Sequence, residues 1–262
     1  MPFGPKMDTN MSEATCWSTS EALGPKDRRY LAPHLYAAEV AGGAVILDMH
    51  SLEYYALDAL SVAALRVNIL DWPQRSTPDG DPERRASSKS LLDSLASRGF
   101  LSAAPADRRF SPSGVPPRSA CHPIWNLRAD SNDVLLMLCR LAAAYPRTLA
   151  YLRVKRLGAL LTQLAPSRNT KSTRSPVPSQ ERILSLVTLY AKLRVWFYTA
   201  KDRCLLDSLV FLAVLRKYDL PATITIGVAP KPFSAHAWVQ IHDCVLDDSV
   251  EHVREYTPIL VA

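Results

Sequence analysis

The 262-residue sequence has no long hydrophobic run and no apolar segment near its start. Its most apolar stretch, from Leu205 to Leu215, falls well short of the ~20 residues that a membrane-spanning helix requires, and it contains Asp207. The opening residues, MPFGPKMDTNMSEATCWSTSE, lack the apolar core of a secretory signal peptide. We therefore expect a cytoplasmic protein that has no membrane partner.

Cysteine is also scarce. The sequence has five cysteines, an odd number, and none of them stands in C-x-x-C spacing. A disulfide framework needs paired cysteines and a structural zinc site needs closely spaced ligands, so we expect neither. The adjacent Cys121 and His122 have no other candidate ligand near them in the sequence. We expect no metal and no cofactor, with at most one or two thiols taking part in chemistry. The cysteines are Cys16, Cys121, Cys139, Cys204 and Cys244.

The sequence also lacks a basic stripe interleaved with aromatic residues, which is typical of nucleic-acid binding. The formal net charge is +6, but much of the excess lies in Pro- and Ser-rich stretches such as residues 108–118 and 168–174. Solvated linkers commonly have this composition, so we expect no nucleic-acid partner. A basic nucleic-acid binder is the weakest alternative, and it would show strong salt-dependent binding to DNA or RNA.

The order of sequence patterns predicts two α+β domains joined by a linker. Residues 1–29 lack periodicity and indicate a flexible tail, whereas residues 30–102 predict three strands and at least two helices. Residues 103–120 are rich in proline and predict an interdomain linker. Residues 121–262 predict a larger domain in which several helices precede a strand and a hairpin.

Local signals mark the elements of the smaller domain. The runs HLYAAEV and AVILDM flank Gly42-Gly43 and predict a hairpin, which a third strand from Glu53 to Leu57 follows. Asp58 stands where the N-cap of the next helix belongs. Residues 73–89 predict a polar loop, and SLLDSLASRGF predicts a helix that ends at Gly99.

Cys204 begins the run CLLDSLVFLAVL, which is apolar on almost every side of a helix and therefore predicts a buried helix. The unpaired N–H groups and the positive dipole end at the start of a helix favour an anion, so this position lowers the pKa of a thiol. The same N–H groups could form half of an oxyanion hole. A buried structural cysteine is the alternative for Cys204 considered alone.

His236 lies in HAWVQI, whose alternation predicts a strand. A histidine base needs a carboxylate that orients it, and Asp247 and Asp248 are the candidates. A two-residue turn would put Asp247 diagonally beside His236, whereas a three-residue loop over residues 241–243 would put Asp248 opposite His236. We favour the longer loop and Asp248, because Asp243 tolerates the left-handed conformation needed at the third loop position.

The C-terminal block resembles the transglutaminase-like protease domain of the B proteins of lasso-peptide biosynthesis, which have a papain-related fold. The resemblance implies a Cys-His-Asp catalytic triad at Cys204, His236 and Asp248. It also implies two partners, a ribosomal precursor peptide whose leader is removed and a separate asparagine-synthetase-like lasso cyclase that uses ATP. The matching segments are Cys204-Leu-Leu-Asp-Ser208-Leu, Leu220-Pro221-Ala222, Ile226-Gly227-Val228, Pro232-Phe233, Ala235-His236-Ala-Trp238-Val and Asp248.

The first domain resembles the small winged-helix-like element that recognises leader peptides in many ribosomal-peptide pathways. The resemblance lies in the segments Val45–Asp48, Tyr54–Asp58, Leu91–Leu92 and Gly99–Leu101. In that family a leader adds as an antiparallel strand to the sheet edge and packs on the last helix. The alternative is that the apolar residues are simply core. The implied leader-binding residues are Tyr54, Tyr55, Leu57, Leu91, Leu92 and Leu95.

These observations predict a cysteine endopeptidase that captures a leader and hydrolyses the leader–core bond, which frees the core N-terminus for macrolactam formation. One alternative is an acyl-transferring transglutaminase-like enzyme, whose product would be an amide crosslink instead of a water adduct. A second alternative is a non-catalytic leader-binding scaffold for the cyclase, whose binding and product yield would survive loss of Cys204 or His236.

Overall fold

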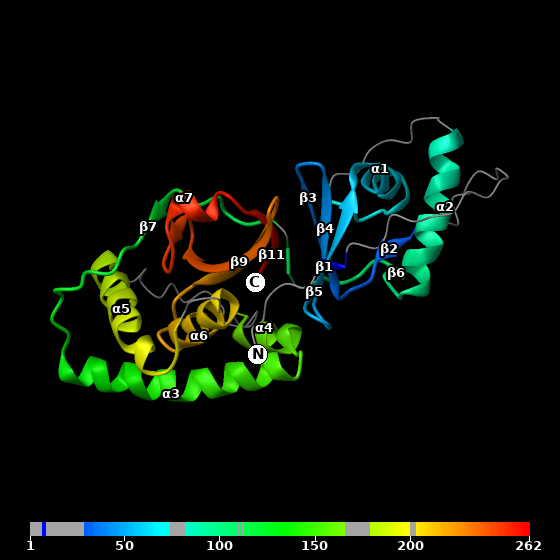
Figure 1. Cartoon of the computed structure of the whole chain (residues 1–262). Coiled ribbons are helices and arrows are strands. Elements are labelled where there is room, and N and C mark those ends of the chain that lie inside the picture. The colour runs from blue at the N-terminus through cyan, green and yellow to red at the C-terminus, as the bar shows by residue number, and fades with distance from the viewer. Residues whose placement is uncertain are drawn as a thin grey trace.

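The structure is a computed structural model that describes residues 7–8, 29–73, 82–108, 110–111, 113–165, 179–199 and 203–262. It mixes helices and sheets, as the sequence predicts. Figure 1 shows the N-terminal elements in blue and cyan on one side and the C-terminal elements, from green to red, on the other. No helix of the described parts is both long and apolar enough to span a bilayer.

The predicted hairpin and third strand are confirmed as β3 (Leu35–Val40), β4 (Gly43–Asp48) and β5 (Glu53–Asp58). Gly42 forms the turn with a positive φ of 85°, which a residue without a Cβ adopts at little cost. From the predicted tail, β1 (Met7–Asp8) pairs in parallel with β5, so the sheet order is β1-β5-β4-β3. Of the remaining tail residues the structure describes only Arg29, which forms a bridge with Ile69.

Two helices and a small strand pair complete this domain. The Asp58 carboxylate caps α1 (Ala59–Asn68) by accepting the backbone N–H of Ser61 at 2.7 Å, which confirms the predicted N-cap. The prediction of a loop over residues 73–89 is wrong in its second part, because α2 (Pro82–Ser97) begins at Pro82. Proline fits the first turn of a helix, since the N–H that it lacks has no partner there. The small pair is β2 (Tyr30–Leu31) with β6 (Leu101–Ser102).

The first sheet is buried on both faces. Ala37, Ile46 and Leu57 pack with α1 and α2 in one cluster, whereas residues that alternate with them on β3 and β4 belong to the core of the C-terminal domain. β3 packs beside β11 (Thr257–Val261) and β8 (Thr223–Pro230). The two domains therefore share a continuous apolar contact. The residues that face the C-terminal domain are Tyr36, Ala38, Val45, Leu47 and Met49.

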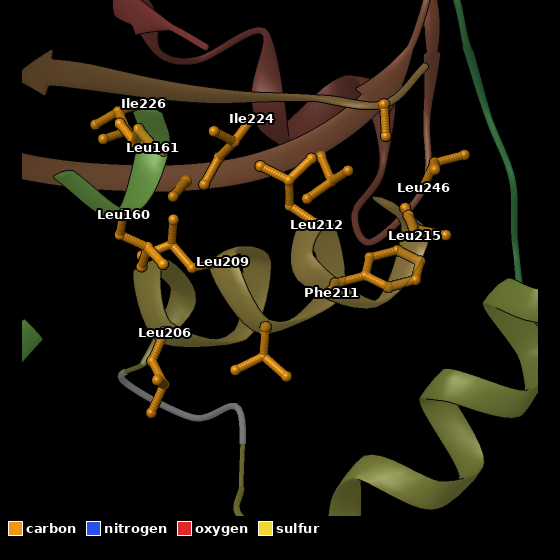
Figure 2. Packing of buried hydrophobic residues seen from close by; sticks show 14 of the residues in the cluster. Leu160, Leu161, Leu206, Leu209, Phe211, Leu212, Leu215, Ile224, Ile226 and Leu246 are labelled. Atoms are coloured by element: carbon orange, nitrogen blue, oxygen red, sulfur yellow. The ribbon is translucent and has the colours of Figure 1, made fainter. Parts of the chain in front are cut away.

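The C-terminal domain is held together by a buried helix, α6 (Cys204–Arg216), which confirms the predicted burial. Leu209 and Leu215 have no exposed surface. Figure 2 shows Leu209 and Leu212 of α6 on the side of the helix that faces Ile224 and Ile226 of β8, where Leu160 also lies, whereas Leu206 points the other way. The surrounding helices are α3 (Ser131–Arg153), α4 (Leu157–Leu164) and α5 (Gln180–Leu193), followed by the 3-10 turn η2 (Arg194–Trp196).

The second sheet has the order β11-β8-β9-β10-β7, with β9 at Phe233–Ile241, β10 at Cys244–Val245 and β7 at Ser119–Ala120. The prediction of a three-residue hairpin loop is wrong, because Ile241 pairs with Cys244 across a two-residue turn. His242 takes the left-handed conformation, with φ 54°, so Asp243 does not need it.

The segment predicted as a linker runs along the C-terminal domain. Its β7 pairs in parallel with β10, and the N–H of Arg118 donates to the carbonyl of Asp243 at 2.8 Å. Earlier in the segment, the Arg108 guanidinium forms an ion pair with Asp71 of the first domain at 2.9 Å. These contacts and the apolar interface fix the path of the segment between the two domains.

Candidate active site

Cys204 is the first residue of α6, and Arg203 before it offers no side-chain hydrogen bond to the helix start. The first N–H groups of the helix are therefore available to an anion, as predicted. The Sγ atom lies 4.0 Å from the carbonyl oxygen of Ala235 on β9. The helix start thus holds the thiol beside the strand that carries His236.

His236 pairs in register with Gly227 of β8. A Cβ at Gly227 would lie 2.9 Å from the Trp238 ring and 2.8 Å from Tyr256, so only glycine fits there without displacing these side chains. The Trp238 ring stacks beside the imidazole, with 6.1 Å between centroids, and is itself buried. The aromatic neighbours and the glycine opposite define the position of the imidazole.

Asp248 approaches His236 with 2.5 Å between Oδ2 and Nε2. Its Oδ1 accepts the backbone N–H of Ser249 at 2.7 Å. Because Nε2 is occupied, the other ring nitrogen of His236 is left for the thiol. The structure therefore brings the three predicted triad residues together, although the hairpin register that we used to choose Asp248 is wrong. β10 ends at Val245, so strand pairing does not extend as far as Asp248.

The electrostatics favour a charged Cys204–His236 pair. Burial opposes ionisation of the thiol, but the hydrogen bond and charge of His236, together with backbone N–H groups, outweigh it and lower the pKa of Cys204. Burial likewise disfavours the imidazolium, yet its hydrogen bond to the Asp248 carboxylate and its contact with Cys204 raise the pKa of His236 to about 9. Burial raises the pKa of Asp248, but its hydrogen bonds to His236, Ser249 and His252 bring it down to about 2. The lowered pKa of Cys204 and the raised pKa of His236 therefore both act in favour of a thiolate–imidazolium pair.

Asp247 has different hydrogen-bond partners from those of Asp248. Its carboxyl group accepts the N–H of Val239 at 2.8 Å and the hydroxyl of Ser208 at 2.8 Å. Burial raises the pKa of Asp247 to about 6, although these hydrogen bonds and the charge of His236 act in the opposite direction. Since Ser208 belongs to α6 and Val239 to β9, Asp247 joins the element of the thiol to the element of the imidazole.

His252 is a second imidazole on the same carboxylate. It lies on α7 (Val250–Val253), and its Nδ1 is 2.8 Å from Oδ2 of Asp248. Its ring centroid is 4.7 Å from that of His236. In the sequence His252 follows Asp248 at i, i+4 spacing, which predicts contact between the two side chains only where a helix forms.

An ion pair with a buried carboxylate joins η2 to α6 near Cys204. The Arg194 guanidinium on η2 contacts the carboxylate of Asp207, which lies one turn after Cys204 in α6. The hydroxyls of Tyr190 and Tyr198 donate to Oδ1 of Asp207 at 2.7 and 2.9 Å. None of these four residues was predicted to belong to the site, although a charged residue in an apolar helix signals a buried partner.

The predicted leader-binding residues divide into three groups. Leu57, Leu92 and Leu95 lie in the core of the first domain, as in the alternative that we considered. Tyr55 and Leu91 are half-buried at the edge of that core, and the Tyr55 ring meets Phe100 edge-on at 5.0 Å.

The third group is Tyr54, which lies on the other face of the sheet. Its ring meets Phe233 edge-on with 5.6 Å between centroids. Burial and the nearby charge of Cys204 raise its pKa well above the ordinary value. Tyr54 therefore lies between the first domain and the candidate active site.

Among the residues that the structure describes, two groups of side chains have ligand atoms close enough to hold a metal ion. One is His236, Asp248 and His252. The other is His34, Asp48 and His50, whose imidazoles stack with 4.3 Å between centroids. In both, the carboxylate already accepts backbone N–H groups: Asp48 takes that of His50 at 2.7 Å, which closes the turn between β4 and β5.

Comparison with known proteins gives one match. Residues 144–261 match the family model described as the transglutaminase-like superfamily. No curated protein and no solved structure matches the chain. The matched segment contains Cys204, His236 and Asp248, and such a domain is consistent with a cysteine protease or an acyltransferase. The C-terminal part of the chain is therefore a transglutaminase-like superfamily domain.

Proposed function

We propose that the chain is a cysteine protease that removes the leader of a ribosomal lasso-peptide precursor. The observation that carries the proposal is the thiol of Cys204 at the start of a buried helix, beside an imidazole whose pKa Asp248 and the thiol raise to about 9. The thiolate attacks the scissile carbonyl, and the imidazolium protonates the leaving amine. Water then hydrolyses the thioester and releases the leader, so the core keeps a free N-terminal amine.

The position of Tyr54 supports a direction for the substrate. β5 begins at Glu53 and ends at Asp58, and its first residues are the ones near Cys204. If a peptide pairs with β5 and the C-terminal end of that peptide continues into the active site, the peptide must run toward Tyr54. That direction is antiparallel to β5, as the resemblance to leader-recognition elements implies.

The outer edge of β5 is able to accept a strand, because β1 pairs there with Met7 opposite Tyr54. β1 runs parallel to β5, so a chain that continued beyond the C-terminal end of β1 would lead away from Cys204. A leader that binds this edge would therefore replace β1. Backbone hydrogen bonds would supply much of the affinity, and side-chain contacts at the strand ends would supply the selection.

The test is incubation with the small precursor encoded beside the gene, with and without the cyclase, followed by mass spectrometry. We expect two fragments whose summed mass exceeds that of the precursor by one water. Cys204→Ala should give no fragments, whereas Cys139→Ala, which removes an exposed thiol, should cleave like the wild type. Cleavage by Cys204→Ala would refute the proposal, and an amide crosslink as product would identify an acyltransferase instead.

A further inference from the structure

A cavity of about 200 Å³ opens beside the thiol. Its lining includes Cys204 and Asp207 of α6, together with His236, Asp248 and Arg194. Arg194 also lines a second cavity, which residues of α5 and Asp248 line too, so Arg194 borders both cavities.

Arg194 is held firmly in this place. Its partner Asp207 is buried, with 8% of its side chain exposed, and two buried phenols, Tyr190 and Tyr198, donate to the same carboxylate. Removing an arginine and an aspartate from water costs free energy that their attraction often fails to recover. A pair of this kind beside a nucleophile is therefore more easily explained by chemistry than by stability.

Attack by a thiolate needs hydrogen-bond donors for the oxygen that becomes negative. The backbone N–H of Cys204 at the uncapped helix start can supply one. Among the described side chains that line this cavity, the hydroxyl of Ser208 is already committed to Ala237 and Asp247. A guanidinium has five N–H donors, and Arg194 directs one nitrogen, Nη1, to Asp207.

We propose that Arg194 is the second oxyanion donor, a further catalytic residue of the reaction that we propose above and on which this inference rests. The Cys204 sulfur forms a bond to the carbonyl carbon, and the π electrons move to the oxygen. Arg194 and the Cys204 N–H donate to that oxyanion. When the carbonyl re-forms, the carbon–nitrogen bond breaks and the His236 proton passes to the leaving amine. Asp207 is a positioning residue that orients the guanidinium.

Two reagents separate this role from a structural one. Acylation of Cys204 by p-nitrophenyl acetate passes through an oxyanion, whereas alkylation by iodoacetamide displaces iodide from a saturated carbon and does not. Both rates depend equally on the thiolate. The Cys204→Ala variant gives the background from the other thiols, including the exposed Cys139.

We expect Arg194→Gln to lower the acylation rate about a hundredfold, as loss of one oxyanion donor typically does. Alkylation should stay within about twofold of the wild type, and Arg194→Lys should lose less acylation because it keeps a charged donor. Arg194→Gln combined with Asp207→Asn removes both charges together and should show the same selective loss. Arg182→Gln, which breaks another arginine–aspartate pair at the start of α5, should change neither rate.

Acylation at the wild-type rate in Arg194→Gln would overturn the inference. Equal losses of acylation and alkylation would also overturn it, because they would mean that Arg194 supports formation of the thiolate or the stability of the fold. If Arg194 instead bound a carboxylate of the substrate, Arg194→Gln should be acylated at the wild-type rate, because p-nitrophenyl acetate carries no charge. A selective loss of acylation would overturn that alternative. The comparison needs no precursor peptide, so it stays decisive even if the wild type fails to cleave the precursor and the proposed function is abandoned.

Discussion

Replacement of Asp248 by asparagine keeps the shape of the side chain and removes its charge. Burial acts to lower the pKa of His236, but other contributions outweigh it and raise this pKa to about 9. The largest of them is the hydrogen bond that the imidazolium donates to Asp248. The rise above the ordinary value of 6.5 is worth roughly 3 kcal/mol in favour of the imidazolium. If the variant loses the whole rise, the protonated fraction at about pH 8 falls from about 0.9 to about 0.03. Cleavage that needs the imidazolium then slows by up to about thirtyfold at that pH.

The assay is the pH dependence of kcat/KM for a peptide that spans the leader–core junction. The wild type should lose activity on the alkaline side near the His236 pKa of about 9, and Asp248→Asn should lose it at a clearly lower pH. Asp243→Asn, in the turn of the same hairpin, is the matched control and should keep the wild-type profile. An alkaline limb that stays in place in Asp248→Asn would refute the assignment of Asp248 as the group that holds the proton on His236.

Three further predictions concern stability and binding. Leu209→Ala removes a fully buried side chain of α6 and should lower the free energy of unfolding by about 2–5 kcal/mol in urea titrations, whereas Leu60→Ala at a 79% exposed position should change it by less than about 0.5 kcal/mol. Because burial raises the folded-state pKa of Asp247 to about 6, the folded protein binds more protons than the unfolded chain between about pH 4 and 6, and roughly 3 kcal/mol of stability is lost as pH rises through that window. Asp247→Asn should remove this slope, and an unchanged slope would contradict the assignment. Deletion of residues 1–8 should vacate the edge of β5 and lower the Kd for a leader peptide in calorimetry, so an equal Kd would argue against competition by β1.

Sequence patterns predicted those parts of the fold that local rules decide. The alternation around Gly42-Gly43 gave the hairpin correctly, and Asp58 gave the start of α1. The apolar run after Cys204 predicted a buried helix, because a helix without a polar face can only lie inside a core. The start of α2 was missed, since the polar composition of residues 73–89 resembles that of a loop.

The hairpin after β9 shows a limit of this reasoning. We chose Asp248 from the register of a three-residue loop, but the turn has two residues and the pairing ends at Val245. The chain then bends, and Asp247 and Asp248 separate toward different partners, Val239 and His236. Strand arithmetic cannot describe residues beyond the last pair, so the correct neighbour of His236 was reached from an incorrect geometry.

The sequence also did not indicate which residues are the partners of Asp207. Its burial could be foreseen, since the surrounding run is apolar, and burial of a charge demands a counter-ion. The counter-ion is Arg194, and the supporting hydroxyls come from Tyr190 and Tyr198. These residues lie before Asp207 in the chain, on α5, on η2 and just after η2, so only the packing of these segments against α6 selects them from the other basic and aromatic residues.

The burial of the first sheet on both faces bears directly on how recognition and catalysis are connected. A domain on a free tether would raise only the local concentration of substrate. Here β5 carries Tyr54 against Phe233, and Phe233 begins β9, the strand that also carries His236. Under the proposed function, a leader that replaces β1 on β5 contacts the strand that lies against the catalytic hairpin. Leader binding can therefore change the geometry of the active site only if the leader binds more tightly to one arrangement of the Tyr54–Phe233 contact than to another.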